Sequence, residues 1–288
     1  MAQNPDYSEF SDPRLVAIYD TVNAIREYKD FYLELGKRLA ATSIIDIGCG
    51  TGLLTYELSK QGHKLIAVEP SLPMIERTLE RVYDGPIRFI HGGVESLDSL
   101  GALEESGALH FDLAIMTGHV AQFFLEDADW QAALASIHKA LRPGGHIAFE
   151  CRNPVVQPWF IASSNSSDSS TSHAISHATS HATSHAAHID WPSATNRRKV
   201  TDPAVGAVEW WSQLIEVIGD RVIYEIHYLF PDSDVKLVSI NELRFRDRTT
   251  IEKSLRDAGF VIENVYGNWD FSLADAASPE FIFVAYRY

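Results

Sequence analysis

The chain has few of the residues that cross-link small secreted proteins. Only two cysteines, Cys49 and Cys151, occur in 288 residues, so a disulfide framework is excluded. Cys49 lies inside a glycine-rich loop, which favours a reduced thiol in a cytoplasmic protein. No apolar run approaches the roughly 20 residues that cross a bilayer, and the acidic, polar start of the chain does not read as a signal peptide. We therefore expect a cytoplasmic location and no membrane partner.

Positive charge is also scarce. The chain has 24 Lys and Arg residues against 39 Asp and Glu residues, which gives a formal net charge of −15. Nucleic-acid binding relies on the opposite sign of charge. Two small basic clusters occur, at 197–199 and at Arg244, Arg246 and Arg248. The second cluster alternates with apolar residues, as on the solvated face of a strand. We expect no nucleic-acid partner.

What the chain does have is enough apolar sequence for a large core, arranged in a regular alternation. Hydrophobic residues make up 45% of it. A helical segment is expected over 14–39. The expected strands are then 44–47, 65–69, 87–91, 111–116 and 146–151, and the expected helices are 51–60, 71–82, 94–104 and 129–140. Residues 141–145, Leu-Arg-Pro-Gly-Gly, predict a helix stop and a turn. Such alternation favours parallel strands joined by right-handed crossovers.

A low-complexity segment interrupts this pattern at 162–188. It consists almost entirely of Ser, Thr, Ala and His, with a four-residue repeat over 172–187. Too little apolar surface is present to offset the ordering entropy, which predicts a disordered insertion. The alternative is a metal-binding tract, since the four repeat histidines would share one face of a helix. No Cys, Asp or Glu lies within the repeat, and we predict no metal site.

After the insertion the apolar period changes to two. Strands are expected at 208–217, 221–230 and 235–246, with a Gly219-Asp220 hairpin signal between the first two. A helix is expected at 249–258, capped by Thr249 or Thr250, followed by strands at 260–266 and 281–287 whose spacing permits an antiparallel last strand. The predicted fold class is α/β: a Rossmann-like seven-stranded, mostly parallel sheet with helices on both faces, plus a small antiparallel β cap. We predict five segments: an N-terminal helical segment (1–43), the ligand-binding core (44–151), a linker that contains the insertion (152–190), the cap (191–248) and the C-terminal part of the core (249–288).

The most informative motif is the glycine loop after the first expected strand. Gly48, Gly50 and Gly52 follow Asp46 and precede a helix, an arrangement that lets the backbone lie against a nucleotide. A dinucleotide fingerprint would place its third glycine one position later and its strand would be apolar throughout. Glu69 closes the next strand, where an acid takes the two hydroxyls of a ribose. Such an acid serves either kind of adenosine ligand, whereas the glycine spacing and Asp46 favour S-adenosylmethionine over a dinucleotide.

With the loop, Glu69-Pro70-Ser71 with Met74, and the turn at 141–145, the chain resembles class I S-adenosylmethionine-dependent methyltransferases, especially their small-molecule branch. The resemblance covers 14–151 and, less closely, 249–288; residues 152–248 match only as a variable cap. It implies S-adenosyl-L-methionine as cofactor. It also implies cofactor contacts at the positions Tyr19, Asp46, Gly48, Cys49, Gly50, Gly52, Glu69, Pro70, Met74, Val94, Glu95 and Thr117.

The resemblance gives several of these residues a role. The loop would pass beneath the methionine portion, and Asp46 would organise the loop or reach the ammonium group through water. Glu69 would bind the ribose, with Pro70 and Met74 beside the adenine. Gly93 stands where the family often has an aspartate, so Val94 and Glu95 are the substitutes there. Tyr19 would cover the methionine carboxylate.

Simpler structural roles remain open for the same residues. Asp46 could only cap the loop, Glu69 could be an acid at a helix N-terminus, and Tyr19 could belong to the core. His119, just after the fourth strand, is either the catalytic base of the acceptor site or an ordinary loop histidine. The aromatic residues Trp159, Trp191, Trp210, Trp211 and Tyr224 either line an acceptor pocket or pack the cap on the core.

The sequence thus predicts an enzyme that moves a methyl group from S-adenosylmethionine to N or O of a small molecule. The expected partner is this small-molecule acceptor, and the sequence leaves the oligomeric state open. Two alternatives stay open: a regulatory protein that binds the nucleotide without catalysis, and an NAD-dependent oxidoreductase. The sequence lacks the dinucleotide glycine spacing and the Tyr-x-x-x-Lys pair that would support the oxidoreductase.

Overall fold

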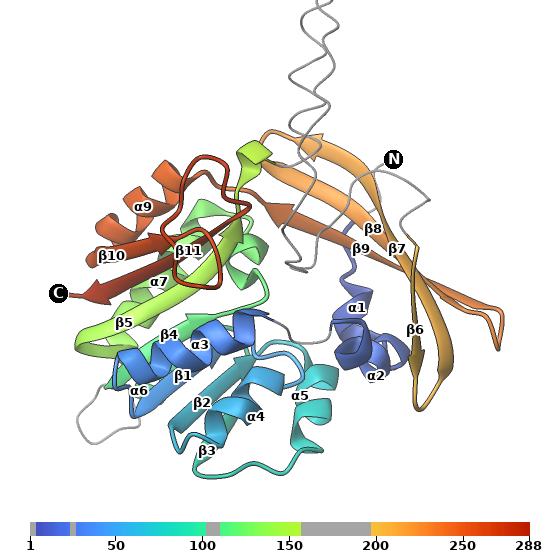
Figure 1. Ribbon diagram of the computed structural model, residues 1–288, viewed down its shortest axis with the longest axis horizontal. Coiled ribbons are helices and arrows are strands. Elements are labelled where there is room, and N and C mark those ends of the chain that lie inside the picture. The colour runs from blue at the N-terminus through green and yellow to red at the C-terminus, as the bar shows by residue number, and fades with distance from the viewer. Residues whose placement is uncertain (1–3, 24–26, 102–109, 157–196) are drawn as a thin grey trace, which may run out of the picture.

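The computed structural model describes residues 4–23, 27–101, 110–156 and 197–288 (Figure 1). The predicted insertion, with Trp159 and Trp191, lies outside these residues. The described chain forms a seven-stranded sheet and a four-stranded sheet. No helix among the described residues is long and apolar enough to cross a membrane.

The larger sheet has the strand order β10-β11-β5-β4-β1-β2-β3. Its strands are β1 (Ser43–Ile47), β2 (Lys64–Glu69), β3 (Ile87–His91), β4 (Phe111–Met116), β5 (Leu141–Arg152), β10 (Phe260–Tyr266) and β11 (Glu280–Arg287). The neighbours from β3 through β5 pair in parallel, whereas β11 is antiparallel to both β5 and β10. The predicted fold class and the antiparallel last strand are confirmed.

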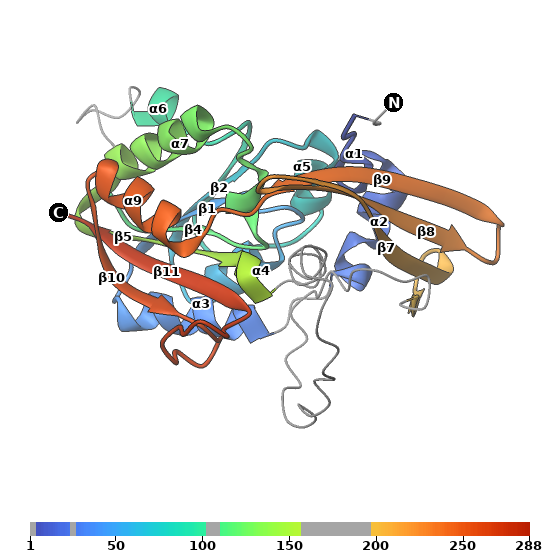
Figure 2. The ribbon, with the colours of Figure 1, turned by 90° about the horizontal axis from the view of Figure 1, so that it is seen from above.

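Alternate side chains of these strands enter two separate apolar cores. One face packs against α6 (Ser96–Gly101), α7 (Asp127–Ala140) and α9 (Arg248–Asp257). The other face packs against α3 (Glu27–Arg38) and α4 (Leu53–Ser59), as Figure 2 shows on opposite sides of the sheet. Along β4, for example, Leu113 and Ile115 join the second core while Ala114 and Met116 join the first. A sheet buried on both faces explains why its strands read as continuous apolar runs.

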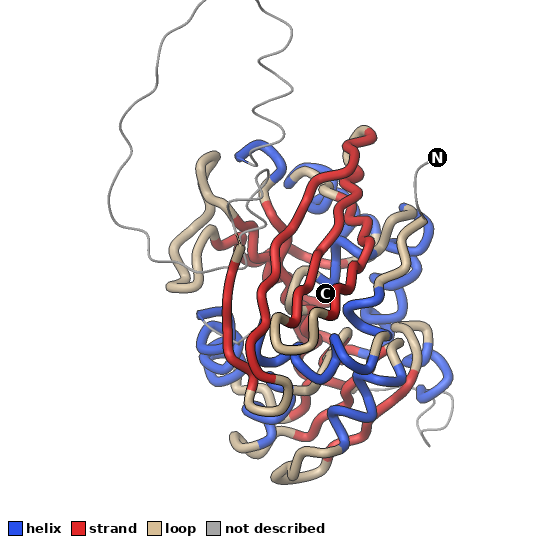
Figure 3. The backbone as a smooth tube through the Cα atoms, turned by 90° about the vertical axis from the view of Figure 1, so that its right-hand side faces the viewer, coloured by secondary structure: helices blue, strands red, loops and turns tan. Residues whose placement is uncertain are grey.

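The smaller sheet is the cap, which we define as β6 (Arg198–Asp202), β7 (Gly206–Ile218), β8 (Arg221–Phe230) and β9 (Val235–Arg244). All of its pairs are antiparallel. Figure 3, which faces the cap, shows its strands in front of the core. Helix α2 (Pro13–Val22) packs on the cap through Leu15 and Ile18. Helices α1 (Ser8–Ser11) and α5 (Leu72–Leu79) lie beside α2.

Several local predictions were wrong. The helical segment expected over 14–39 is divided into two helices, α2 and α3, and the cap has a fourth strand, β6. Helix α7 does end at Ala140, as the motif at 141–145 predicts, but these residues belong to β5, where a register shift opposite Phe111 and Leu113 accommodates the extra residues. Asp247, and not a threonine, caps α9, because its carboxylate accepts a hydrogen bond from the Thr250 amide at 2.7 Å.

A carboxylate at the start of β4 ties three strands together. Asp112 accepts hydrogen bonds from the amides of Thr42 and Ser43 and from the guanidinium of Arg142. Burial by itself would raise the pKa of Asp112, but these donors outweigh it and hold the pKa well below its usual range. A depressed carboxyl pKa stabilises the fold above the unfolded-state pKa and stops doing so as the pH falls through the folded value.

We expect Asp112→Asn to lower the free energy of unfolding by about 2 kcal/mol at pH 7. The difference from the wild type should shrink below pH ~4, where the unfolded-state carboxyl takes up a proton. Urea unfolding of both proteins across this pH range measures it. A difference that stays constant down to pH ~3 would contradict the assignment.

Candidate active site

The glycine loop between β1 and α4 has the backbone that the sequence predicts. Gly48, Gly50 and Gly52 have φ values of 69°, 57° and 72°, in the left-handed region that favours glycine. A Cβ atom on Gly48 would lie 2.5 Å from a methyl group of Val120. At Gly50, by contrast, the nearest atom is in the Tyr19 ring at 4.0 Å, so the loop leaves open space there. A ligand can therefore approach the backbone at this point.

Asp46 lies beneath the loop and is 1% exposed. Its Oδ2 accepts a hydrogen bond from the Thr55 hydroxyl at 2.5 Å, while Oδ1 is buried without a hydrogen-bond partner in the described chain. Burial raises the pKa of Asp46 to about 6. A buried acceptor without a donor costs free energy. The site thus offers an unused acceptor oxygen next to the loop.

Glu69, at the end of β2, faces the same loop. Its Oε2 accepts a hydrogen bond from the Gly50 amide and its Oε1 accepts one from the Ser71 amide, both at 2.9 Å. The side chain therefore braces the loop and also the N-terminus of α5. Burial raises the pKa of Glu69, although the two amides oppose the shift. Each oxygen keeps acceptor capacity for one more donor, as two ribose hydroxyls would require.

The remaining predicted cofactor residues fall into two groups. Tyr19, Cys49, Pro70, Val94, Glu95 and Thr117 line one cavity together with the three residues Gly48, Gly50 and Glu69. Met74, Asp46 and Gly52 do not line it: Met74 and Asp46 are buried, and a Cβ on Gly52 would meet the Tyr83 hydroxyl and Thr78. Their effect on a ligand is through the packing of α5 and the loop.

The end of β4 carries the strongest backbone distortion in the site. His119 has a φ of 64°, which is uncommon for a residue other than glycine, and it follows Gly118 at 70°. The Glu150 carboxylate stabilises this turn by accepting a hydrogen bond from the His119 amide at 3.0 Å. Tyr32 donates its hydroxyl to the other oxygen of Glu150. Strained backbone of this kind persists where the surroundings hold it, often at functional sites.

The imidazole of His119 is held by a second carboxylate. Nε2 lies 3.1 Å from both oxygens of Glu280, and the ring is 9% exposed. An ionised carboxylate only accepts hydrogen bonds, so in the neutral ring Nε2 carries the proton and Nδ1 carries the lone pair. Nδ1 has no hydrogen-bond partner in the described chain, and His119 lines the cavity. This arrangement is suited to accepting a proton.

The cavity lies between the core and the cap and has a volume of about 1400 Å³. Its wall combines the glycine loop, the end of β4, α1, α2 and the inner face of the cap. Of the aromatic residues predicted for an acceptor pocket, Trp210, Trp211 and Tyr224 line it. Such a volume can hold an adenosine-type ligand together with a second small molecule. No group of three or more metal-ligating side chains occurs among the described residues.

Sequence reasoning missed several charged residues of this site, and four of them bear on its chemistry. Glu9, Glu150 and Arg152 line the cavity, and Glu280 orients His119. Glu150 and Arg152 interrupt an otherwise apolar strand, which is the same signal that singled out Asp46. Glu9 carries no such signal, because its place depends on the docking of α1 against the distant strand β9.

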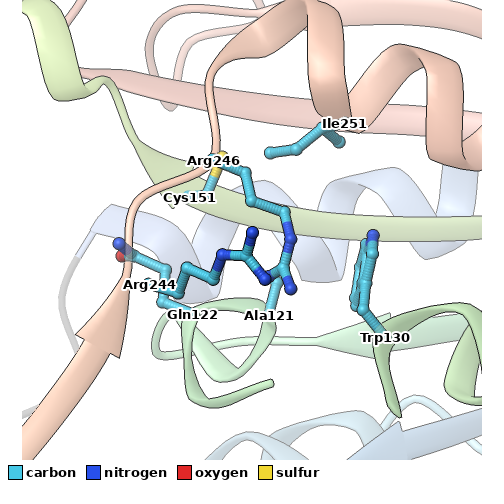
Figure 4. Close-up of a pocket in the computed structure, with 7 residues that line it drawn as sticks. All are labelled: Ala121, Gln122, Trp130, Cys151, Arg244, Arg246 and Ile251. Carbon is cyan, nitrogen blue, oxygen red and sulfur yellow. The ribbon is translucent and has the colours of Figure 1, made fainter. Parts of the chain in front are cut away.

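The arginines at the end of β9 also differ from the prediction. They do not form a solvated face: Arg246 is 5% exposed and Arg244 lies beside it, both with Asp127 as ion-pair partner. Figure 4 shows the two guanidinium groups close together near Trp130 and Gln122. This small cavity, of about 10 Å³, has room for no more than a water molecule. The cluster joins the cap to α7.

Comparison with known proteins adds the family context. Residues 44–145, about a third of the chain, match the family model described as a methyltransferase domain. Cypemycin N-terminal methyltransferase from a Streptomyces species is 26% identical over 118 residues, which is 40% of this chain and 44% of that protein. The chain spans about half the length of the curated relatives it matches.

Solved structures extend the similarity to the whole fold. The sugar N-methyltransferase KedS8 from Streptoalloteichus superimposes with a TM-score of 0.63 at 15% identity, covering 100% of this chain and 95% of that one. S-adenosylmethionine-bound CalS10, an amino pentose methyltransferase from Micromonospora echinaspora, gives a TM-score of 0.61 at 16% identity, covering 94% and 97%. At these identities the likeness concerns the fold, cap included.

Proposed function

We propose that this chain, whose residues 44–145 match the methyltransferase-domain family model, is an S-adenosylmethionine-dependent enzyme that transfers a methyl group to a nitrogen or oxygen atom of a small molecule. The observation that carries the proposal is the cavity itself. One wall has the glycine loop with Glu69 beside it, and another has His119 and the cap. The groups proposed for cofactor and acceptor thus face one shared cavity.

The residues at the loop fit S-adenosylmethionine by their chemistry. Glu69 has acceptor capacity for the ribose hydroxyls. Asp46 does not line the cavity, so in this proposal it organises the loop from beneath, where Thr55 donates a hydrogen bond to it. Val94 and Glu95 would lie beside the adenine, and Tyr19 would cover the methionine portion from α2. In this proposal Met74 and Gly52 act only by shaping α5 and the loop.

Bound S-adenosylmethionine supplies a methyl carbon that an acceptor lone pair attacks while the carbon–sulfur bond breaks and sulfur keeps the electron pair. The chain has to align the acceptor and exclude water, and proximity and orientation supply most of the rate. Nδ1 of His119 receives the proton that the acceptor loses. Glu280 and Glu150 hold the imidazole and its backbone in place for this step.

A small-molecule acceptor fits the size of the cavity and the charge of the chain. Aromatic side chains of the cap line the cavity. The net charge of −15 disfavours nucleic acid as a substrate. Among the similar proteins, the printed names of KedS8 and CalS10 specify a sugar and an amino pentose. These names support a metabolite acceptor for this chain as well.

Calorimetry with S-adenosylmethionine tests the first half of the proposal, with an expected Kd near the micromolar level, about −8 kcal/mol. Incubation of the protein with methyl-labelled S-adenosylmethionine and a small-molecule metabolite extract tests the second half, with label expected in a small product. Binding without transfer would identify a non-catalytic binding protein. Absence of binding would refute the proposal.

A further inference from the structure

Helix α1 lies between the core and the cap (Figure 1). It carries one acidic residue, Glu9, which lines the cavity. The Glu9 amide donates a hydrogen bond to the Ser239 hydroxyl of β9 at 3.0 Å. The Ser71 hydroxyl, next to the cofactor acid Glu69, donates to the Phe10 carbonyl. The backbone of α1 is thus fixed on both sides of Glu9, and the side chain has a defined position.

The Glu9 carboxylate is buried but poorly paired. It is 7% exposed and lines the cavity. Its one hydrogen bond in the described chain is from the Tyr228 hydroxyl to Oε2, at a long 3.5 Å, and no Lys, Arg or His among the described residues lies within ion-pair distance. Buried carboxylates in proteins are normally paired, because an unpaired one is costly. The other oxygen of Glu9, Oε1, has no donor among the described residues, and a ligand in the cavity can supply one.

Aromatic rings surround the same part of the cavity. The ring of Phe123 packs against Tyr7 at 6.0 Å and against Phe10 at 5.6 Å, measured between centroids, and Phe10 packs against Tyr19 at 6.1 Å. All four residues line the cavity. Faces of aromatic rings attract cations, as a carboxylate does. A carboxylate and a set of rings together favour a cationic group of modest size.

We propose that Glu9 binds the amino group of the methyl acceptor and thereby selects acceptors that carry a basic amine. The inference rests on the proposed methyl transfer and narrows it. An ammonium group supplies the donors that Glu9 lacks and neutralises its charge inside the cavity. A hydroxyl supplies one donor and no charge, so alcohols are discriminated against.

Charged and titratable groups around Glu9 set the pH at which this recognition operates. Burial raises the pKa of Glu9 to about 7, while Tyr228 and the positive charge of Arg152 on β5 oppose the shift. Tyr224 and Tyr19 face it from β8 and α2 and stay neutral, because burial raises the pKa of both phenols. The carboxylate form therefore prevails above pH ~7 and the neutral acid below it. Amine recognition should weaken as the pH falls through this value.

The test compares wild type, Glu9→Gln and the surface control Glu76→Gln in calorimetry, with the cofactor product S-adenosylhomocysteine present. The probes are three amines, glucosamine, phenethylamine and putrescine, each with its alcohol counterpart, glucose, phenethyl alcohol and butanediol. We expect wild type and control to prefer at least one amine over its alcohol by about tenfold or more. Glu9→Gln should lose that preference while it binds S-adenosylhomocysteine as before. Between pH 8 and pH 6 the amine affinity of the wild type should fall and that of the variant should not.

Each outcome decides the point. No amine preference in the wild type, or an unchanged preference in Glu9→Gln, overturns the role of Glu9 and leaves methyl transfer standing. Failure of the wild type to bind S-adenosylhomocysteine refutes the proposed function itself. Misfolding is controlled by thermal unfolding: Glu9→Gln removes a costly buried carboxylate, so it should unfold at the same temperature as the wild type or higher.

Discussion

Glu69→Ala should weaken the binding of S-adenosylmethionine by at least about a hundredfold, or ~3 kcal/mol. Two effects add up. The ribose loses its two charged acceptors, and the Gly50 and Ser71 amides lose the carboxylate that braces the loop and the start of α5. Hydrogen bonds to a charged group contribute about 1.5–3 kcal/mol each, so the loss of two accounts for the change. Calorimetric titration of both proteins measures it.

The matched control is Glu76→Ala. Glu76 is an exposed glutamate on α5, outside the cavity, and its replacement should leave the Kd unchanged. Glu69→Gln separates the two effects, because its amide oxygen can keep one acceptor but not the charge; we expect an intermediate Kd. If Glu69→Ala binds as tightly as the wild type, Glu69 acts only as an acid at the start of α5, and the cofactor lies elsewhere.

The sequence predicted the core of this fold because local and long-range preferences agree there. Strands buried on both faces give continuous apolar runs, and the helices between them are amphipathic. The predictions that failed concern features decided by partners. Nothing local to 141–145 indicates that Leu141 pairs with Phe111 of β4, so that β5 begins before the Pro-Gly-Gly segment. Likewise, residues 198–202 form the strand β6 because they pair with β7.

The site residues follow the same distinction between local signals and long-range contacts. Asp46 and the glycines could be predicted because their chemistry is local: a charge in an apolar strand and left-handed backbone positions. Glu280 could not, because it is 161 residues from His119 and reaches it only through the antiparallel last strand. Glu9 similarly depends on a contact with Ser239, 230 residues away. Residues whose signal is local can thus be predicted from the sequence, and residues whose place depends on long-range contacts cannot.

His119→Asn should lower kcat by about 10²- to 10³-fold and leave the Kd for S-adenosylmethionine unchanged. The substitution removes the proton acceptor Nδ1, and asparagine tolerates the left-handed backbone at this position. Glu280→Gln should have a smaller effect, about tenfold, because an amide no longer dictates which imidazole nitrogen carries the proton. Steady-state rates of labelled-methyl transfer, measured against pH, distinguish the two variants: Glu280→Gln should change the shape of the pH profile and His119→Asn should remove its dependence on the imidazole.

The control for this prediction is His146→Asn. His146 also has its Nε2 3.1 Å from a glutamate, Glu263, but it lies outside the cavity, so its loss should leave kcat unchanged. If His119→Asn and His146→Asn both lowered kcat, the cause would be a general loss of stability. An unchanged kcat in His119→Asn would mean that His119 does not take the proton of the acceptor. The pair of variants at 119 and 9 therefore separates proton removal, seen in kcat, from acceptor recognition, seen in KM.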